Sequence, residues 1–214
     1  MDEDVEVSSA PAALPSQNPV VQLPEFTEMI REVFRTYLNQ KSSVELHVVL
    51  LEILMCIGPS EWSLIFPDQA QGDELVKYLL SLKDAQSGAC PPALRAAAIQ
   101  TCAYLLSQPR FAKMEDLVNG TFQFVFDTAA EPNLILQVRN SQATKELCTY
   151  LLSSPELYKS QIDRVIQLLR VILVYANSSR DKVTANAIRA LGFFLAQVDI
   201  GHLQKEIDQE NQSA

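Results

Sequence analysis

The octapeptide Cys-Ala-Tyr-Leu-Leu-Ser-Gln-Pro at residues 102–109 recurs as Cys-Thr-Tyr-Leu-Leu-Ser-Ser-Pro at residues 148–155. The two copies start 46 residues apart, and Cys56 precedes the first copy by the same interval. A short string that returns at a constant interval indicates one structural unit used more than once. An interval of this length is typical of stacked helical pairs, so the sequence predicts a repeat architecture.

Composition favours helices along most of the chain. The 214 residues include only 6 glycines, and 48% of them are hydrophobic, enough for one sizeable core or one continuous stack. Apolar side chains recur at steps of three and four between short breaks rich in Pro, Ser, Gly or Asn, as on one face of a helix. We therefore predict an all-α fold with about four helix pairs, whose helices lie at 26–37, 43–57, 73–82, 92–107, 112–128, 134–153, 156–176 and 181–198.

The two ends of the chain differ from this helical region. Residues 1–22 are acidic and rich in Ser, Ala and Pro, and they carry too little apolar surface to offset the entropy of ordering. We expect a disordered acidic tail there, a helical repeat domain at 23–200 and a short amphipathic or frayed tail at 201–214. The start lacks the hydrophobic segment of a secretory signal, and no apolar run approaches the roughly 20 residues of a membrane span. These features predict an intracellular protein, cytoplasmic or nuclear, with reduced cysteines.

The last predicted helix resembles the second helix of a HEAT repeat. Val183 is followed four and seven places later by the small residues Ala187 and Ala190. Small residues there let paired helices approach closely, and larger apolar residues fill the seam between them. The residues that match the family pattern are Val183, Ala187, Ala190, Leu191, Gly192 and Phe194, with a second set at Leu94, Arg95, Ala98, Cys102 and Leu105.

The resemblance implies a fold and a function. The fold would be an alpha–alpha superhelix, a HEAT/armadillo-like solenoid, and the function a protein–protein interaction scaffold without enzymatic activity. In that family the second helix of each pair lines the concave side, where a protein partner binds. The positions that would face a partner are Gln100, Gln142, Glu146, Asn186 and Arg189. An equally open interpretation is that these five are merely solvated polar residues. A different class also stays open, namely a small all-α ligand- or lipid-binding domain, or an enzyme, with an enclosed pocket.

Few residues are arranged for metal or covalent chemistry. The four cysteines form no pair at the two-to-four-residue spacing usual in zinc sites. Cys56, Cys102 and Cys148 are interpreted as small core residues. His47 and His202 are the only histidines, and neither is expected beside a thiol, as a Cys–His nucleophile requires. We therefore expect no cofactor, no metal and no catalytic residue.

Charge and the end of the helical region bear on the choice of partner. The net charge of −9 argues against nucleic acid as a partner, because binding nucleic acid needs a cationic surface.

Phe193 and Phe194 lie on the last predicted helix, with little apolar chain after them to cover them. Because a terminal repeat is covered on one side only, we expect either that residues 202–210 fold over this end or that it self-associates.

Overall fold

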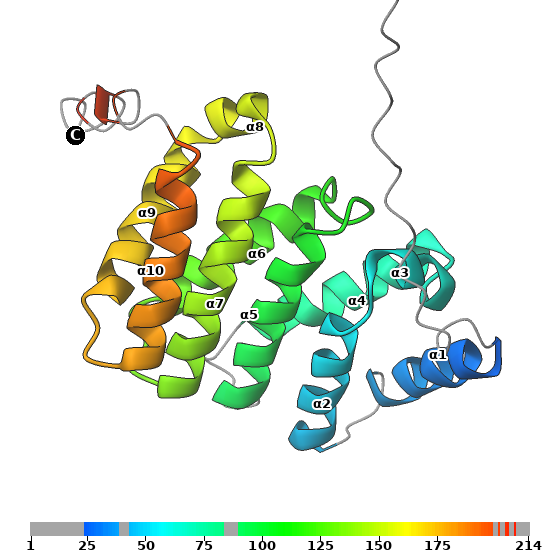
Figure 1. The fold of residues 1–214 in the computed structure, drawn as a ribbon. Helices are drawn as coiled ribbons and strands as arrows, with labels where there is room; N and C mark the ends of the chain where they lie inside the picture. Colours follow the sequence, from blue (N-terminus) through cyan, green and yellow to red (C-terminus); the bar gives the residue numbers. More distant parts are fainter. Residues whose placement is uncertain are drawn as a thin grey trace, which may run out of the picture.

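A computed structural model describes residues 24–38, 43–83 and 90–198, together with Gly201, Gln204, Lys205 and Asp208. Ten α-helices account for most of these residues and none of them lies in a strand, so the all-α prediction is confirmed (Figure 1). The tails expected at 1–22 and 201–214 fall outside the described residues, apart from the four C-terminal residues just named. The helices are α1 (Pro24–Leu38), α2 (Val44–Met55), α3 (Pro59–Ile65), α4 (Gln69–Ser81), α5 (Pro92–Leu106), α6 (Glu115–Thr128), α7 (Leu134–Leu151), α8 (Pro155–Ser160), α9 (Ile162–Ala176) and α10 (Asp181–Leu195).

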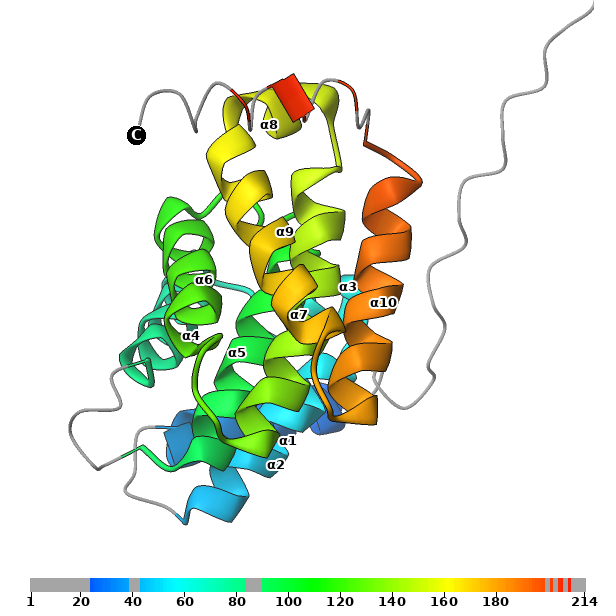
Figure 2. The same cartoon turned by 90° about the vertical axis from the view of Figure 1, so that its left-hand side faces the viewer.

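The helices pack in two layers. One layer is a row in which α2, α5, α7 and α10 lie side by side, each packed against the next (Figure 1). The second layer contains α4, α6 and α9, with α6 packed against both of the others. Each second-layer helix also packs against the row helix that follows it in the chain, which pairs α4 with α5, α6 with α7 and α9 with α10. In Figure 2, which views the α9–α10 end, α4 and α6 lie on one side and α10 on the other.

Local sequence sets several helix boundaries. The hydroxyls of Ser43 and Ser154 each accept a hydrogen bond from the backbone N–H three residues later, at the starts of α2 and α8. Asn133 Oδ1 accepts from two backbone N–H groups at the start of α7. These side chains satisfy N–H groups that have no partner inside the helix, which is why such residues favour helix starts.

The predicted set of eight helices was wrong in two places. Pro59 begins the short helix α3 directly after Gly58, in the interval between the helices predicted at 43–57 and 73–82. Proline suits the first turn of a helix because the N–H that it lacks would have no partner there. The helix expected at 156–176 is divided at Gln161 into α8 and α9. The backbone of Gln161, at φ −126° and ψ 33°, leaves the helical region and ends α8.

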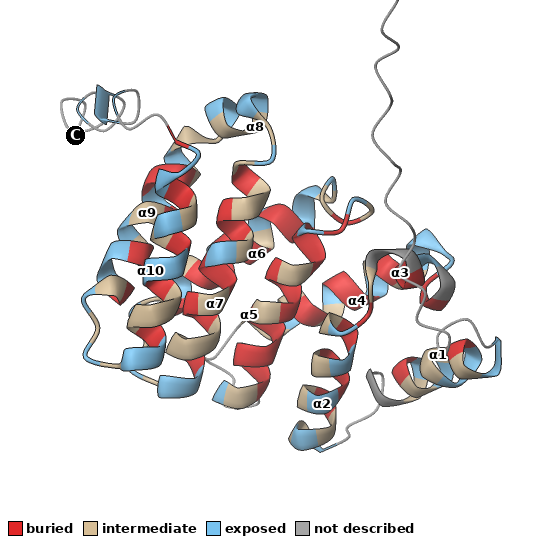
Figure 3. Cartoon of the chain, in the orientation of Figure 1, coloured by how far each residue is buried: buried red, intermediate tan, exposed pale blue. Residues whose placement is uncertain are grey.

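Three helices of the row bury the same positions counted from their N-caps, which are Pro91, Asn133 and Arg180. The residues three, seven, ten and fourteen places later are at most 5% exposed in α5, α7 and α10 (Figure 3). These positions lie within about 60° of one another on a helix, so they form one stripe. The stripe contains Leu94, Ala98, Thr101 and Leu105 in α5, Leu136, Asn140, Ala143 and Leu147 in α7, and Val183, Ala187, Ala190 and Phe194 in α10.

Asn140 shows which way this stripe faces. It takes the position that holds Ala98 in α5 and Ala187 in α10. Its amide nitrogen donates to the backbone oxygen of Val125 at 2.9 Å and to Thr128 Oγ1 at 2.8 Å, and both acceptors lie on α6. These bonds satisfy the buried amide nitrogen of Asn140 and join α7 to the second layer.

The cysteines do not mark this common register. The three N-caps are 42 and 47 residues apart, and Cys102 and Cys148 lie eleven and fifteen places after theirs. Both thiols are buried, as predicted for core residues, and burial raises the pKa of each to about 12. The prediction that Cys56 is a core residue is wrong. Cys56 is exposed because it lies two turns after Val49 on the exposed side of α2.

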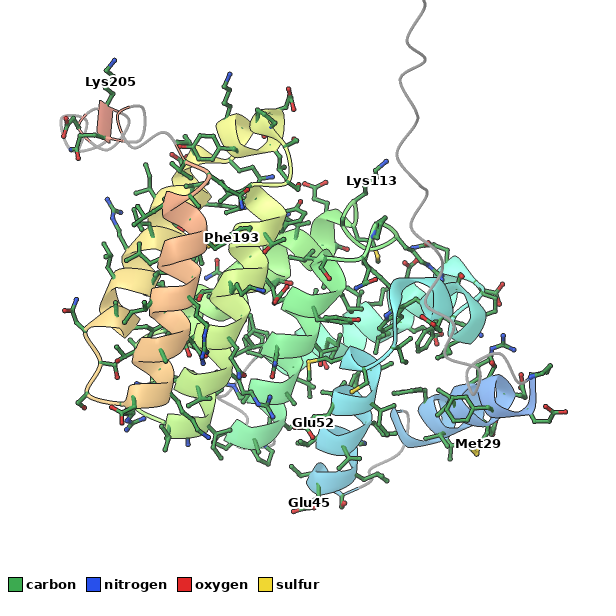
Figure 4. All side chains as sticks on the ribbon, in the orientation of Figure 1. Met29, Glu45, Glu52, Lys113, Phe193 and Lys205 are labelled. Atoms are coloured by element: carbon green, nitrogen blue, oxygen red, sulfur yellow. The ribbon has the colours of Figure 1, made fainter. Side chains whose placement is uncertain are left out.

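The two phenylalanines near the end of α10 do not form an uncovered pair. Phe194 is 1% exposed, since it takes the stripe position that holds leucine in α5 and α7. Phe193, labelled in Figure 4, is half-buried and packs against the core. The expectation that both residues form an exposed end was therefore wrong. Ile188 and Leu195 are the large apolar residues that α10 exposes.

Arginine side chains hold the starts of successive row helices in line. Arg95 in α5 donates to both carboxylate oxygens of Glu131, at 2.7 and 2.9 Å, just before α7 begins. Arg180 at the start of α10 donates to Gln137 Oε1 at 3.0 Å and to the backbone oxygen of Pro132 at 3.1 Å. A guanidinium group offers several donors in one rigid plane, so each arginine fixes two acceptors at once.

Candidate functional site

A groove crosses the row formed by α2, α5, α7 and α10. Its volume is about 340 Å³, and residues from all four helices line it. The five residues singled out from the sequence all lie in its lining, although they are as many as 89 positions apart in the chain. The lining consists of Met55, Gln100, Tyr104, Ser141, Gln142, Lys145, Glu146, Asn186 and Arg189.

The predicted residues meet because they recur at fixed places in their helices. Gln100, Gln142 and Arg189 each lie nine places after the N-cap of α5, α7 or α10. Asn186 lies six places after its N-cap, and Glu146 thirteen. Residues six, nine and thirteen places along lie within about 60° of one another on a helix. The same spacing from the N-cap that places the core stripe in the interior therefore also brings these polar side chains to one face of the row.

Arg139 of α7, which the sequence analysis missed, connects three of the four helices. Its Nη1 donates to Gln100 Oε1 on α5 at 2.6 Å, and its Nη2 donates to Glu52 Oε1 on α2 at 2.6 Å (Figure 4 labels Glu52). The ion pair is partly exposed, so it contributes no more than about 1 kcal/mol to stability. Its main effect is on geometry, because it fixes the amide of Gln100 at one side of the groove.

Asn186 has the matching role on α10. It lies six places after its N-cap, as Arg139 does, and its amide nitrogen donates to Ser141 Oγ at 3.2 Å across the α7–α10 seam. Arg189 Nη1 donates to Asn186 Oδ1 at 3.2 Å. Ser141 of α7 therefore orients Asn186, and Asn186 in turn orients Arg189.

The middle of the groove offers both acidic and basic groups. Lys145 and Glu146 form an ion pair at 3.5 Å, and Tyr104 Oη donates to the backbone oxygen of Ile57 at 2.6 Å. Burial raises the pKa of Tyr104, so its hydroxyl stays neutral at physiological pH. Gln142 Oε1 is buried and accepts no hydrogen bond within the described residues. The groove therefore brings an acidic group, a basic group and a phenol hydroxyl together at its lining.

The groups considered for metal or nucleophilic chemistry lie elsewhere. His47 is buried and its Nδ1 lies 3.0 Å from Tyr78 Oη, while burial raises the pKa of Tyr78 to about 12. His202 lies outside the described residues. In the part of the chain that the structure describes, no three His, Cys, Asp or Glu side chains are grouped so as to hold a metal ion. None of the helices described has the length and apolar character needed to cross a membrane.

Comparison with protein-family models, with curated proteins and with solved structures found no match for this chain. The resemblance to HEAT repeats stays a prediction from the residues quoted above. The function is accordingly argued from the groove and from the packing of the row.

Proposed function

We propose that this protein is a non-enzymatic scaffold that binds a protein partner through the groove across α2, α5, α7 and α10. The observation that carries this proposal is the convergence of five polar side chains. The HEAT-like pattern predicts from the sequence that all five face a partner. They line one groove although they come from three helices.

The recurring register supports the architecture behind this proposal, a superhelix of about four HEAT-like helix pairs. α5, α7 and α10 bury the same four positions, and each is paired with a helix of the second layer. One unit used repeatedly, with each copy packed mainly on its neighbours, is the arrangement of helical repeat proteins. Such rows commonly present one extended surface to a partner.

Preorganisation supports the groove as the binding surface. Arg139 and Asn186 hold the polar side chains of α5 and α10 in place before a partner arrives, which lowers the entropy lost on binding. The Lys145–Glu146 pair offers both signs of charge. The proposed partner is therefore a protein segment with hydrogen-bond donors and mixed charge, in keeping with a polar interface rim.

A pair of matched double variants tests this proposal. Gln142→Ala with Arg189→Ala removes one amide and one cation from the groove. Gln123→Ala with Lys113→Ala removes one amide and one cation from exposed positions outside its lining. Each immobilised variant is incubated with an extract of the source organism, and the retained proteins are quantified by mass spectrometry. At least one protein retained by the parent and the control should fall about tenfold with the groove variant, a loss of about 1.4 kcal/mol.

Thermal unfolding of the same variants separates binding from folding. We expect the groove variant to melt within about 2 °C of the parent, since Arg189 is exposed and the buried oxygen of Gln142 has no hydrogen bond to lose in the part of the chain that the structure describes. Equal retention of every protein by both double variants would remove the groove from the proposal. A large drop in melting temperature for the groove variant alone would show that these residues serve the fold instead.

The alternative, a ligand- or lipid-binding domain or an enzyme with an enclosed pocket, has less support. The apolar pocket between α1, α3 and α4, lined by Phe34, Ile65, Phe66 and Leu75 among others, has a volume of about 110 Å³. Pockets for small organic ligands usually measure about 300–1,000 Å³. The larger hollows among the described residues are open at the surface, as expected of grooves between packed helices.

A further inference from the structure

One side of α10 is apolar and uncovered, although the same side of α5 and α7 is buried. The residues eight and fifteen places after the N-cap are Ile99 and Leu106 in α5 and Ser141 and Cys148 in α7, all at most 1% exposed. In α10 the same places hold Ile188 and Leu195, which are 57% and 48% exposed.

In the middle of the row, this side forms the seam with the next helix. Ser141 of α7 receives the hydrogen bond from Asn186 of α10, so the side of α7 that carries Ser141 faces α10. By the same register, the Ile188 side of α10 is where a further helix would pack. The adjoining helix α9 adds Leu173 and Val174, which are 44% and 64% exposed (Figure 2 views this end). We call these four exposed apolar residues of α9 and α10, Leu173, Val174, Ile188 and Leu195, the α10 end.

A repeat protein that ends its stack in solution usually presents a polar outer side on its last unit. The α10 end is apolar instead, and large apolar patches on a protein surface commonly mark interaction sites. The C-terminal residues Gly201 and Lys205 do not supply the cover, because they line a hollow with α8 and the end of α7.

The opposite end of the row also exposes apolar side chains. Met55 of α2 lines the groove, and Ile53 lies two residues before it. Two residues on a helix differ by about 200°, so Ile53 faces away from the groove side. Val49 lies one turn before Ile53, and both are exposed. We call these two residues, together with Met29 of α1, which is 53% exposed (labelled in Figure 4), the α2 end.

The helices that carry the two ends have opposite net charge. α1 and α2 contain five glutamates and two arginines. α9 and α10, with the N-cap Arg180, contain five basic residues and two aspartates. Charge complementarity of this kind steers two surfaces together and disfavours contact between like ends.

We propose that a second copy of this chain docks head to tail, with the α10 end of one copy packed on the α2 end of the next. Exposed apolar residues at both ends and the opposite net charges of their helices favour this arrangement over a symmetric pair of α10 ends, in which helices of like net charge would meet. A head-to-tail contact leaves one free end of each kind, so the assembly grows with concentration. The proposal rests on the row and its ends and is independent of the groove.

Sedimentation velocity of the full chain at rising concentration tests this contact. The parent should form species heavier than the 23.8 kDa chain, and raising the salt from about 0.05 M to 0.5 M should weaken the association at least threefold. Ile188→Glu and Val49→Glu should each be monomeric alone, because each blocks one end with a buried carboxylate. Ile135→Glu is the matched control, since Ile135 is 50% exposed near the start of α7 and belongs to neither end. It should associate as the parent does.

Mixing the two blocked variants gives the decisive result. Each retains the end that the other has lost, so an equimolar mixture should form a two-chain species and no larger one. A parent that stays monomeric at every concentration overturns the proposal. An effect of Ile188→Glu without any effect of Val49→Glu would replace it with a symmetric contact between α10 ends. Circular dichroism of each variant confirms that loss of association is not loss of folding.

Discussion

α5 and α10 share one core stripe but differ in how much of the rest of the helix is covered. Eleven of the fifteen residues of α5 are buried, against four of the fifteen in α10 (Figure 3). α5 has α2 and α7 on its two sides, whereas α10 has α7 as its neighbour in the described row. The core stripe therefore follows from the position of each residue relative to its N-cap. Burial of the remaining sides follows from a helix's place in the row.

The largest test of this comparison uses two adjacent residues of α10. Phe194 lies in the shared stripe and is 1% exposed, while Leu195 lies on the α10 end and is 48% exposed. Phe194→Ala should lower the free energy of unfolding by about 3–5 kcal/mol, because it leaves a cavity in the core. Leu195→Ala should lower it by less than about 1 kcal/mol. Urea unfolding followed by circular dichroism at micromolar concentration measures both.

Equal costs for the two variants would contradict the comparison. They would mean that Leu195 is as well covered in solution as Phe194. If the cost of Leu195→Ala rose only at high protein concentration, the cover would come from a second chain, in agreement with the head-to-tail contact. Leu105→Ala in α5 is the reference, since Leu105 has the stripe position of Phe194 in a helix with row neighbours on both sides.

Thiol reactivity tests the uncovered side directly. Cys148 of α7 and Leu195 of α10 both lie fifteen places after their N-caps. Burial raises the pKa of Cys148 to about 12, so at pH 8.5 this thiol is almost wholly protonated and unreactive. In a background with Cys56→Ser and Cys90→Ser, a Leu195→Cys thiol should have an ordinary pKa and react with iodoacetamide at least 100-fold faster than Cys148.

Peptide mass spectrometry at successive times gives both rates in one sample of the folded protein. Cys102, with a pKa also raised to about 12 by burial, is an internal control and should stay unmodified. Labelling should become equal for all three thiols in concentrated urea. Similar rates for the Leu195→Cys thiol and Cys148 in the folded protein would show that the α10 side is covered after all.

The sequence was sufficient to predict the helical class because apolar residues recur with the helical period in nearly every segment. The interval between the cysteines, however, predicts the wrong register for the repeat. Cys102 and Cys148 are conspicuous, but they lie eleven and fifteen places into their helices, so their interval shifts the frame of α7 by four residues. The N-caps carry the register instead, and Asn133 is a residue whose capping role could have shown it. In that frame, Asn140 is a polar residue at an alanine position.

The groove could be predicted only in part for the same reason. Gln100, Gln142 and Arg189 share one place in their helices, and a HEAT-like frame selects them without coordinates. Arg139 and Asn186 both lie six places after their N-caps, but the 46-residue interval between the cysteines does not relate these two positions. Glu52 could not be found at all, because its ion pair with Arg139 joins residues 87 positions apart. That contact depends on how closely α2 and α7 approach each other across α5, which local sequence does not specify.

The smallest effect is expected at two glycines inside helices. A β-carbon at Gly192 of α10 would meet no atom within 4 Å, whereas one at Gly120 of α6 would lie 2.8 Å from Leu80 Cδ1 on α4. Alanine is favoured over glycine in a helix by about 1 kcal/mol. Gly192→Ala should therefore raise the free energy of unfolding by about 1 kcal/mol, because the gain meets no opposing contact.

Gly120→Ala is the matched control, and it gains the same helix propensity while overpacking the α4–α6 contact, at a cost of about 1–3 kcal/mol. It should therefore be neutral or destabilised, and urea unfolding resolves the difference between the two variants. If Gly192→Ala failed to stabilise the monomer, some group would have to occupy the space beside α10 that the structure leaves open. If Gly120→Ala stabilised the protein equally, Leu80 would have to move aside without loss, and the second layer would be packed more loosely than the row. The pair thus compares a covered and an uncovered helix by the addition of one methyl group.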